Sequence, residues 1–466
     1  MTTITLAQAI QAAQGSANAA LTAIGTEKSV TGFVVDSRSV RPGVLFVAIA
    51  GENVDGHDFA QDAVNAGAVA VLASRELPDV PCIVVDDAVL ALGRIAHWYR
   101  TRVLTATVIG VTGSSGKTTT KDLIADVLPG NVVAARGSFN TEVGLPLSIM
   151  EADASTDYLV LEMGMRGLGH IRYLAEIAEP DIGVVLNVGL AHVGLMDGPD
   201  QIARAKSELV QVLSTEATAV LNADDPAVRG MAKATNARVV LFGESQSAAV
   251  RAESASLDAS GRANFCLRIG DAPGVSVALN LHGQHFVSAA LAAATVASTC
   301  GVPIEQIASA LEAAGARSPH RMEVRTSAHG VTVINDSYNA NPDSMRAALK
   351  TLRSMAGDGR TWAVLGEMRE LGDHSLPEHD AIGRLVVRLD ISRLICVGSG
   401  TRVMHLAASN EGSWADESVW VEDVPGAIEI LDRELQPGDS VLIKASRAIG
   451  LEVVAEHLLA GEEEAE

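Results

Sequence analysis

Runs of apolar residues alternate with amphipathic stretches through the middle of the chain. Continuous apolar runs occupy 158–162, 182–188, 218–221 and 238–242. Such runs are typical of strands buried on both faces of a sheet. Helical periodicity at 169–178 and 200–213 separates the first three runs. This alternation of strand and helix predicts a doubly wound, mostly parallel α/β sheet.

The pattern changes after residue 246. Polar and apolar residues alternate over much of 247–281, which predicts antiparallel strands added to the parallel sheet. Apolar stretches at 286–299 and 304–314 then predict two helices that close this part of the chain.

Both ends of the chain carry further α/β patterns. Short strands are expected within 32–47 and 69–87, around a helix near 59–66. C-terminal strands are expected at 331–335, 362–365, 394–397, 418–421 and 440–443. We therefore predict three α/β domains: a small N-terminal domain (1–104), a central domain (105–317) and a Rossmann-like C-terminal domain (318–466).

Composition narrows the class of protein. The chain has 466 residues, 48% of them hydrophobic, and a formal charge of −22. A negative field of this size argues against nucleic acid or an anionic membrane as a partner. The four cysteines share no metal-binding spacing, the N-terminus lacks the features of a secretion signal, and the apolar stretch at 286–300 is short. We expect a cytoplasmic protein without membrane insertion.

The most informative segment is 107–121, a β-branched strand followed by a glycine-rich turn and a Lys-Thr helix start. Glycines allow the backbone to wrap around a phosphate, and the helix start offers unpaired N–H donors. The usual first glycine of the motif is replaced by Val111, which leaves the shorter Thr-Gly-x-x-Gly-Lys-Thr form. We expect a phosphate loop that binds ATP through Thr112, Gly113, Ser114, Ser115, Gly116, Lys117, Thr118 and Thr119.

Polar residues near the ends of the central strands are further candidates, because function gathers at the carboxyl edge of such sheets. Glu162 ends a buried strand and is suited either to ligate Mg²⁺ or to cap the next helix. His192 is either functional or an ordinary loop residue, and Lys206 taken alone is a solvated helix residue. Asn140 is equally explained as a turn former.

The C-terminal third offers a second group. Asp336 follows a strand and is suited to hold a ribose hydroxyl, while Arg321 is suited to pair with a phosphate. Asn341 precedes a proline, so a purely structural role at the start of a helix is also expected. Lys444 and Arg447 follow the last strand, where either an anion clamp or structural ion pairing is expected.

Taken together, these segments resemble the Mur ligase family, the ATP-dependent amide ligases of peptidoglycan precursor synthesis. Motifs in the family's order are Thr-Gly-Ser-Ser-Gly-Lys-Thr, Ser-Phe-Asn-Thr-Glu-Val-Gly-Leu-Pro, Leu-Glu-Met-Gly-Met, Asn-Val-Gly-Leu-Ala-His and Ala-Lys-Ser-Glu. Two more, Asn-Asp-Ser-Tyr-Asn-Ala-Asn-Pro-Asp-Ser-Met and Leu-Gly-Glu-Met-Arg-Glu-Leu-Gly, resemble the branch that adds D-alanyl-D-alanine to UDP-MurNAc-tripeptide. The N-terminal Asp-Ser-Arg segment (36–38) resembles the family's UDP-binding domain.

The resemblance implies a role for each candidate. Lys117, Glu162, His192 and Lys206 would be catalytic, with Thr118, Glu162, His192 and carbamylated Lys206 ligating two Mg²⁺ ions. Arg321, Asp336 and Asn339 would contact ATP from the C-terminal domain. UDP-MurNAc-tripeptide would be bound by Ser37, Arg38, Asn53, Asn140 and Thr141, and D-Ala-D-Ala would lie near Asn341, Lys444 and Arg447.

One position departs from the family. The family commonly carries His-Asn-x-x-Asn in the helix after the antiparallel strands, where this chain has Phe286 and Ala289 after His285. We therefore expect the adenine contact to be made differently or more loosely.

The resemblance also implies a mechanism, in which ATP converts the tripeptide carboxylate to an acyl phosphate that the dipeptide amine attacks. The central and C-terminal domains would close around this intermediate about a hinge near 315–320.

We expect a monomer.

Four alternatives remain open. A neighbouring family member would add a single amino acid, and a folylpolyglutamate synthase would lack the Asp-Ser-Arg domain. A nucleotide-binding switch or an inactive scaffold would bind ATP without ligase activity.

Overall fold

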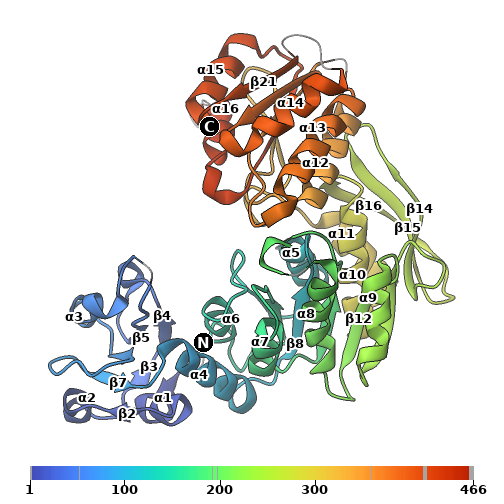
Figure 1. Cartoon of the computed structure of the whole chain (residues 1–466). Helices are drawn as coiled ribbons and strands as arrows, with labels where there is room; N and C mark the ends of the chain where they lie inside the picture. Colours follow the sequence, from blue (N-terminus) through green and yellow to red (C-terminus); the bar gives the residue numbers. More distant parts are fainter. Residues whose placement is uncertain are drawn as a thin grey trace.

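A computed structural model describes residues 3–51, 53–191, 193–196, 198–357, 359–412 and 417–460. It contains three α/β units, here called the N-terminal, central and C-terminal units after their order in the chain. In Figure 1 the N-terminal unit lies at the lower left, the central unit beside it, and the C-terminal unit above the central one. The predicted α/β class with mostly parallel sheets is confirmed. The domain boundaries at 104 and 317 stay a prediction.

The N-terminal unit has a mostly parallel sheet of strand order β2-β7-β6-β5-β4, with β2 antiparallel to β7. Its strands are β2 (Ser16–Ala17), β4 (Gly32–Val34), β5 (Val44–Val47), β6 (Ala70–Ala73) and β7 (Cys82–Val84), and β1 (Ile4–Thr5) pairs separately with β3 (Ser29–Val30). Its helices are α1 (Leu6–Ala13), α2 (Ala19–Ile24), α3 (Ala60–Asn65) and α4 (Ala88–Arg102). Helix α4 packs against the central unit and joins the two.

The central sheet has the strand order β16-β15-β14-β13-β12-β11-β8-β10-β9. Its parallel part comprises β8 (Thr107–Thr112), β9 (Val132–Ala134), β10 (Tyr158–Glu162), β11 (Ile182–Val185), β12 (Thr218–Asn222) and β13 (Arg238–Gly243). Strands β10, β11 and β12 are almost completely buried, as their continuous apolar runs predict, and β8 is buried in the same way. Strand β13 is only partly buried, so the prediction of burial on both faces is wrong for 238–242.

Helices cover this sheet, and an antiparallel part extends it. The helices are α5 (Lys117–Val127), α6 (Gly144–Ile149), α7 (His170–Ala178), α8 (Pro199–Gln211), α9 (Pro226–Gly230), α10 (Phe286–Thr299) and α11 (Ile304–Ala313). The strands β14 (Val250–Leu257), β15 (Arg262–Ile269) and β16 (Val275–His282) form the extension seen at the right of Figure 1. The predicted antiparallel addition is confirmed, and α10 has the predicted bounds.

The C-terminal sheet has the order β17-β18-β22-β19-β20-β21, parallel except at the β17 edge. Its strands are β17 (Glu323–Thr326), β18 (Thr332–Asn335), β19 (Thr361–Leu365), β20 (Arg393–Val397), β21 (Ser418–Val421) and β22 (Ser440–Lys444). Its helices are α12 (Pro342–Met355), α13 (Ser375–Arg388), α14 (Arg402–Glu411), α15 (Val424–Glu434) and α16 (Glu452–Leu459). Strands β18, β19 and β22 are parallel, so their carboxyl ends lie at one edge of the sheet.

The segment that joins the central and C-terminal units is tied to helix α5. Ser318 donates a hydrogen bond of 2.6 Å from Oγ to Asp122, and Arg317 pairs with Asp126. His320 and Met322 have φ angles of 60° and 49°, in the left-handed region that such residues rarely adopt. The contacts with α5 therefore fix a strained turn next to the phosphate loop.

The close packing of α13 on α14 gives a test of the C-terminal unit. A Cβ added to Gly383 would lie 2.1 Å from the backbone oxygen of Met404. Because this backbone cannot move without separating the helices, we expect Gly383→Ala to destabilise the unit by about 1–3 kcal/mol. Thermal unfolding followed by circular dichroism measures the effect.

Gly230→Ala is the matched control. A Cβ at this helical glycine meets no atom within 4 Å. Its unfolding temperature should stay the same or rise slightly, because alanine only restricts the unfolded chain. Equal unfolding temperatures for the two variants would contradict the packing argument.

Candidate functional site

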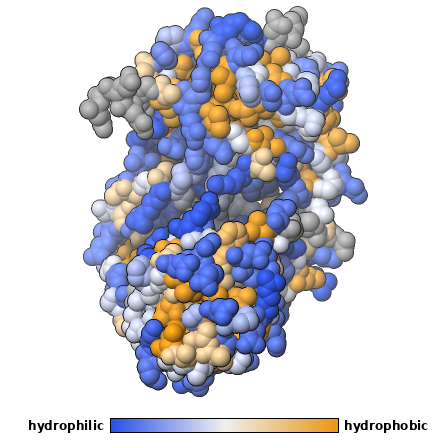
Figure 2. All heavy atoms as spheres, turned by 90° about the vertical axis from the view of Figure 1, so that its left-hand side faces the viewer, coloured by the Kyte–Doolittle hydropathy of each residue, from blue (hydrophilic) through white to orange (hydrophobic). Residues whose placement is uncertain are grey.

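A cavity of about 1750 Å³ is lined by residues of the central and C-terminal units. Figure 2 shows the surface hollowed between an upper and a lower lobe, with hydrophilic residues along the recess. The lining residues follow the carboxyl ends of β8, β10 and β11 on one side and of β18, β19 and β22 on the other. Open α/β sheets bind ligands at this edge, so two such edges face one another here.

The phosphate loop lies between β8 and α5. Gly116 has a φ of 77°, a left-handed conformation that lets the chain turn directly into the helix. A Cβ at Gly113 would lie 2.9 Å from Cβ of Leu186, so this position also has no room for a side chain. Lys117 lines the cavity and donates from Nζ to the carbonyl oxygen of Gly113 at 2.8 Å. The loop thus wraps around its own lysine in the manner of a phosphate cradle.

Asn187 holds the loop in this shape, a role that the sequence analysis did not assign. Its Oδ1 accepts hydrogen bonds from the backbone N–H groups of Ser114 at 2.9 Å and Ser115 at 3.0 Å. Its Nδ2 donates to the carbonyl oxygen of Ser115 at 3.2 Å. The only sequence signal is an asparagine soon after a buried strand, since 73 residues separate it from Ser114.

Glu162 lines the cavity and is 1% exposed. Its carboxylate accepts hydrogen bonds of 2.7 Å from Thr118 Oγ1 and of 2.7 Å from Asn140 Nδ2. The helix-cap alternative has no support here, since Gly169 precedes α7 and its N–H donates to Glu208 instead. A hydroxyl and a carboxylate side by side next to a phosphate loop are the protein ligands that Mg²⁺ takes when phosphates supply the rest.

Lys206 lies on α8 and is 1% exposed. It is therefore not the solvated helix residue that the sequence alone suggested. Burial lowers the pKa of its amine well below the ordinary value, and the nearby charge of Lys117 lowers it further. His192 lies outside the described residues.

No group of three or more His, Cys, Asp or Glu side chains within the described residues is placed to hold a metal ion by itself. This agrees with a site that depends on substrate oxygens, because Mg²⁺ is commonly bound through one or two carboxylates plus phosphates. Thr118 and Glu162 fit that role.

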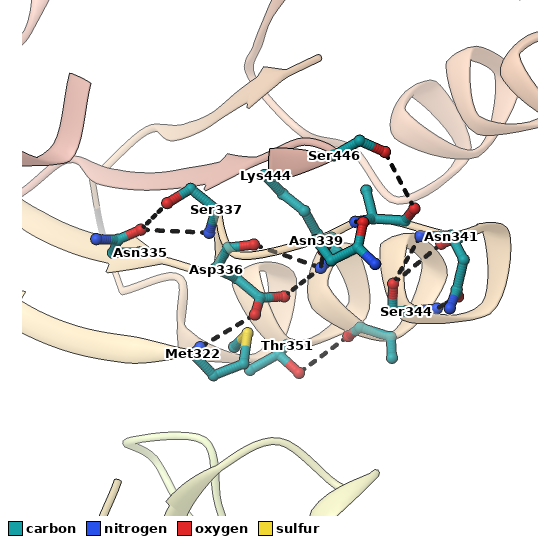
Figure 3. A network of polar contacts seen from close by, with 12 residues as sticks. Met322, Asn335, Asp336, Ser337, Asn339, Asn341, Ser344, Thr351, Lys444 and Ser446 are labelled. Carbon is teal, nitrogen blue, oxygen red and sulfur yellow. Dashed lines mark hydrogen bonds and ion pairs between the residues drawn. The ribbon is translucent and has the colours of Figure 1, made fainter. Parts of the chain in front are cut away.

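Across the cavity, Asp336 and Lys444 form a buried ion pair (Figure 3). The Nζ of Lys444 lies 2.7 Å from Asp336 Oδ2 and donates to the carbonyl oxygen of Asn339 at 2.7 Å. Asp336 also accepts from the backbone N–H of Met322 at 3.2 Å. The ammonium of Lys444 is thus held within the C-terminal unit, in line with the structural ion pairing considered from the sequence.

Tyr338 lies between two guanidinium groups. Arg321 is stacked 4.0 Å from its ring centre and Arg447 5.0 Å. Its hydroxyl contacts Ser138, which belongs to the central unit. The Nε of Arg321 is buried and has no hydrogen-bond partner among the described residues. Tyr338 therefore positions two cations and contacts the opposite side of the cavity.

Two further contacts join the units. Asn341 caps α12 and donates from Nδ2 to the carbonyl oxygen of Ser114 in the phosphate loop at 3.4 Å. The backbone N–H of Gly194 donates to the carbonyl oxygen of Glu370 at 2.9 Å. The helix-start reading of Asn341 is correct, and the same residue also touches the loop.

Most candidates from the sequence come together in this one cavity. Those that line it are Ser114, Ser115, Gly116, Lys117, Thr118, Thr119, Asn140, Thr141, Glu162, Arg321, Asp336, Asn339, Asn341, Lys444 and Arg447. Thr112, Gly113 and Lys206 are buried next to it without lining it. Phe286 and Ala289 also line it, so an apolar surface is present where the family commonly has asparagines.

The N-terminal candidates lie elsewhere. Ser37, Arg38 and Asn53 do not line the cavity. The side chain of Arg38 is 88% exposed and pairs with Asp36 at 2.7 Å. Residues of the N-terminal unit that do reach the cavity are Asp87, Val89 and Leu90, at the start of α4. Within the described part of the chain, no helix is both long enough and apolar enough to span a bilayer.

Three family models match the chain. The model for the Mur ligase middle domain matches residues 111–297, that for the Mur ligase glutamate ligase domain matches 320–447, and that for the Mur ligase family catalytic domain matches 29–98. Together they cover each of the three units.

Similar proteins are known along nearly the whole length. A UDP-N-acetylmuramoyl-tripeptide–D-alanyl-D-alanine ligase of Mycobacterium bovis is 48% identical over 476 residues, which cover 93% of each chain. The Escherichia coli ligase of that name is 31% identical over 93% of this chain and 95% of its own. MurF from Acinetobacter baumannii matches the structure with a TM-score of 0.88 at 30% identity. The match covers 98% of this chain and 99% of that one. MurF of Thermotoga maritima in complex with ADP matches with a TM-score of 0.80 at 30% identity. The match covers 93% of this chain and 98% of that one.

The Thr118–Glu162 contact predicts how the site depends on magnesium. Thr118→Val removes the hydroxyl at nearly constant volume and should raise the Mg²⁺ concentration needed for ATP binding by about tenfold or more. Thr118→Ser keeps the hydroxyl and should stay near the wild type. Isothermal titration of ATP at a series of Mg²⁺ concentrations distinguishes them, and an equal effect of both variants would rule the hydroxyl out as a ligand.

Proposed function

The chain belongs to the Mur ligase family, and from this we propose that it joins D-alanyl-D-alanine to UDP-MurNAc-tripeptide with cleavage of ATP to ADP and phosphate. The product is UDP-MurNAc-pentapeptide, a precursor of peptidoglycan. The observation that carries the proposal is the single cavity in which the phosphate loop and Glu162 face the segments 335–345 and 365–372 of the C-terminal unit.

The chemistry begins with an unreactive carboxylate. Its oxygen is a poor leaving group, so the free acid does not acylate an amine at neutral pH. Transfer of the γ-phosphoryl group of ATP to the tripeptide carboxylate forms an acyl phosphate and releases ADP. The amine of the dipeptide then attacks the carbonyl carbon, and phosphate leaves with the bonding electron pair while the amine loses a proton.

The chain contributes positioning and charge to this reaction. The loop amides and Lys117 hold the phosphates, with the loop braced by Asn187. Arg321 brings a further cation from the C-terminal unit, and its unpartnered Nε is available to a phosphate oxygen. These groups offset the negative charge that spreads over the transferred phosphoryl group.

We assign the magnesium sites to Thr118, Glu162, His192 and Lys206 as its carbamate, for two ions. Bound Mg²⁺ would neutralise phosphate charge. The lowered pKa of Lys206 supports the carbamate, because only a neutral amine reacts with CO2.

The remaining sites are assigned by the element that carries them. ATP also contacts Asp336 and Asn339, and the dipeptide lies near Asn341, Lys444 and Arg447. The UDP-linked substrate is bound by Ser37, Arg38, Asn53, Asn140 and Thr141. The protein acts as a cytoplasmic monomer of three domains, bounded near 104 and 317.

The substrate assay also separates this function from two others. A neighbouring family member would use a single amino acid in place of the dipeptide. An inactive scaffold would bind ATP without turnover, and the apolar residues Phe286 and Ala289 at the adenine side are the feature that favours it.

Substrate dependence of phosphate release tests the proposal. With UDP-MurNAc-tripeptide, D-Ala-D-Ala, Mg²⁺ and bicarbonate present, phosphate should appear together with UDP-MurNAc-pentapeptide, and omission of either substrate should abolish sustained release. Release with a single amino acid would assign the chain to a neighbouring branch. ATP binding without any release would support the scaffold.

Carbamylation of Lys206 predicts a requirement for CO2. The wild type should lose activity in CO2-depleted buffer and regain it on addition of bicarbonate. Lys206→Arg keeps a long nitrogen-bearing side chain but forms no stable carbamate, so we expect a loss on the order of 100-fold that bicarbonate does not restore.

A carbon-13 carbamate signal after labelling with bicarbonate gives a readout independent of turnover. It should be present in the wild type and absent in Lys206→Arg. Full activity in rigorously CO2-free buffer would refute the carbamate.

A further inference from the structure

Residues 367–372 of the segment Leu-Gly-Glu-Met-Arg-Glu-Leu-Gly (365–372) line the cavity from the C-terminal unit, and the phosphoryl transfer proposed above makes no use of them. The segment begins at the carboxyl end of β19, the strand next to β22. This is the position where open α/β sheets bind ligands, on the side of the cavity opposite the phosphate loop.

Two buried side chains hold this segment rigidly. The backbone N–H of Met368 donates to Nε2 of His379 at 3.0 Å, and this histidine is 0% exposed. Ser446, which is 5% exposed, accepts from the backbone N–H of Arg369 at 2.9 Å through Oγ and donates its own N–H to the carbonyl oxygen of Glu367 at 3.0 Å. The segment is therefore preorganised before any ligand binds.

Ser446 brings the backbones of two arginines to the same strand ends. Arg369 is bound to Ser446 through its backbone, and Arg447 is the next residue in the chain. Both arginines line the cavity. Their surroundings differ from those of Lys444, whose ammonium is enclosed by Asp336 and the carbonyl of Asn339.

These two arginines keep most of their charge available. The side chain of Arg369 is 54% exposed, and the carboxylate assigned to it, Glu367, lies 4.0 Å away, at the limit of an ion pair. Arg447 stacks on Tyr338 at 5.0 Å, and no ion pair to it is found among the residues that the structure describes. Two guanidinium groups that line one cavity from backbone positions joined at Ser446 are suited to bind one carboxylate by several hydrogen bonds.

We propose that Arg369 and Arg447 bind the terminal carboxylate of the acceptor dipeptide, with Glu367 positioning the guanidinium of Arg369. The inference rests on the proposed function, since it assigns the acceptor end of that reaction. The dipeptide then lies along 366–372 with its amine directed toward the phosphate loop, where the acyl phosphate forms.

This arrangement explains selectivity for a dipeptide by length. Each residue of an extended chain spans about 3.5 Å. An acceptor anchored by its carboxylate at the two arginines would leave the amine of a single amino acid about 3.5 Å short of the carbonyl carbon, a distance that prevents attack. The position of 366–372 is fixed against the central unit, because Gly194 N–H donates to Glu370 and a Cβ at Gly194 would lie 2.3 Å from the nitrogen of Gly372.

The test compares D-Ala-D-Ala with its C-terminal amide, which has the same shape without the negative charge. The wild type should prefer the acid, with a KM for the amide about 10- to 100-fold higher. Arg369→Ala and Arg447→Ala should each raise the KM for the acid by about tenfold or more, and leave the KM for the amide and for ATP nearly unchanged. Discrimination between acid and amide should therefore shrink in each variant.

Arg402→Ala is the control, since Arg402 lies on α14 outside the cavity and stacks on Trp420 at 5.4 Å. It should keep the preference of the wild type. An equal rise of both KM values in Arg369→Ala and in Arg447→Ala, or an unchanged preference for the acid in both, would overturn the assignment. Absence of turnover by the wild type with D-Ala-D-Ala would instead refute the proposed function, so the two failures are distinguishable.

Discussion

The constraint on which this structure depends is electrostatic. A chain with a formal charge of −22 has to bind ATP and a nucleotide-linked acid, both of which its overall field repels. Charge can be reversed only locally, by cations and backbone N–H groups gathered where water is excluded. The two facing sheet edges provide this, because the phosphate loop and Lys117 lie on one and Arg321, Arg369 and Arg447 on the other.

The acidic residues at the site determine which cations stay available. Asp336 takes up the charge of Lys444 inside the C-terminal unit, and this pair fixes the turn that carries Tyr338. Tyr338 in turn contacts Arg321 and Arg447 through its ring, and no ion pair of either guanidinium is found within the described part of the chain. One buried ion pair thus supports two cations that face the cavity.

The sequence predicted the parts whose signals are local. The phosphate loop, the buried strands and α10 depend on neighbouring residues, and each was found where its pattern placed it. For Glu162 the sequence left two roles open, a Mg²⁺ ligand and a helix cap. Its contact with Thr118 joins residues that are 44 positions apart, so no local pattern could decide between them. The roles of Asn187 and Tyr338 were missed for the same reason. The Tyr338–Ser138 contact spans 200 residues, and no periodicity within either segment signals it.

The contacts between the units are made by the same segments that line the cavity. Asn341 touches the phosphate loop, Tyr338 touches the loop before Asn140, and Glu370 touches the turn at Gly194. An acyl phosphate has to be kept from water until the amine arrives, so closure and recognition of the acceptor have to occur together. When the residues that recognise the acceptor also form the contacts between the units, the acceptor binds the closed form more tightly than the open form. A bound acceptor then stabilises the closed form. On the proposed assignment of the acceptor site, the amine acceptor itself would complete the enclosure in which it reacts.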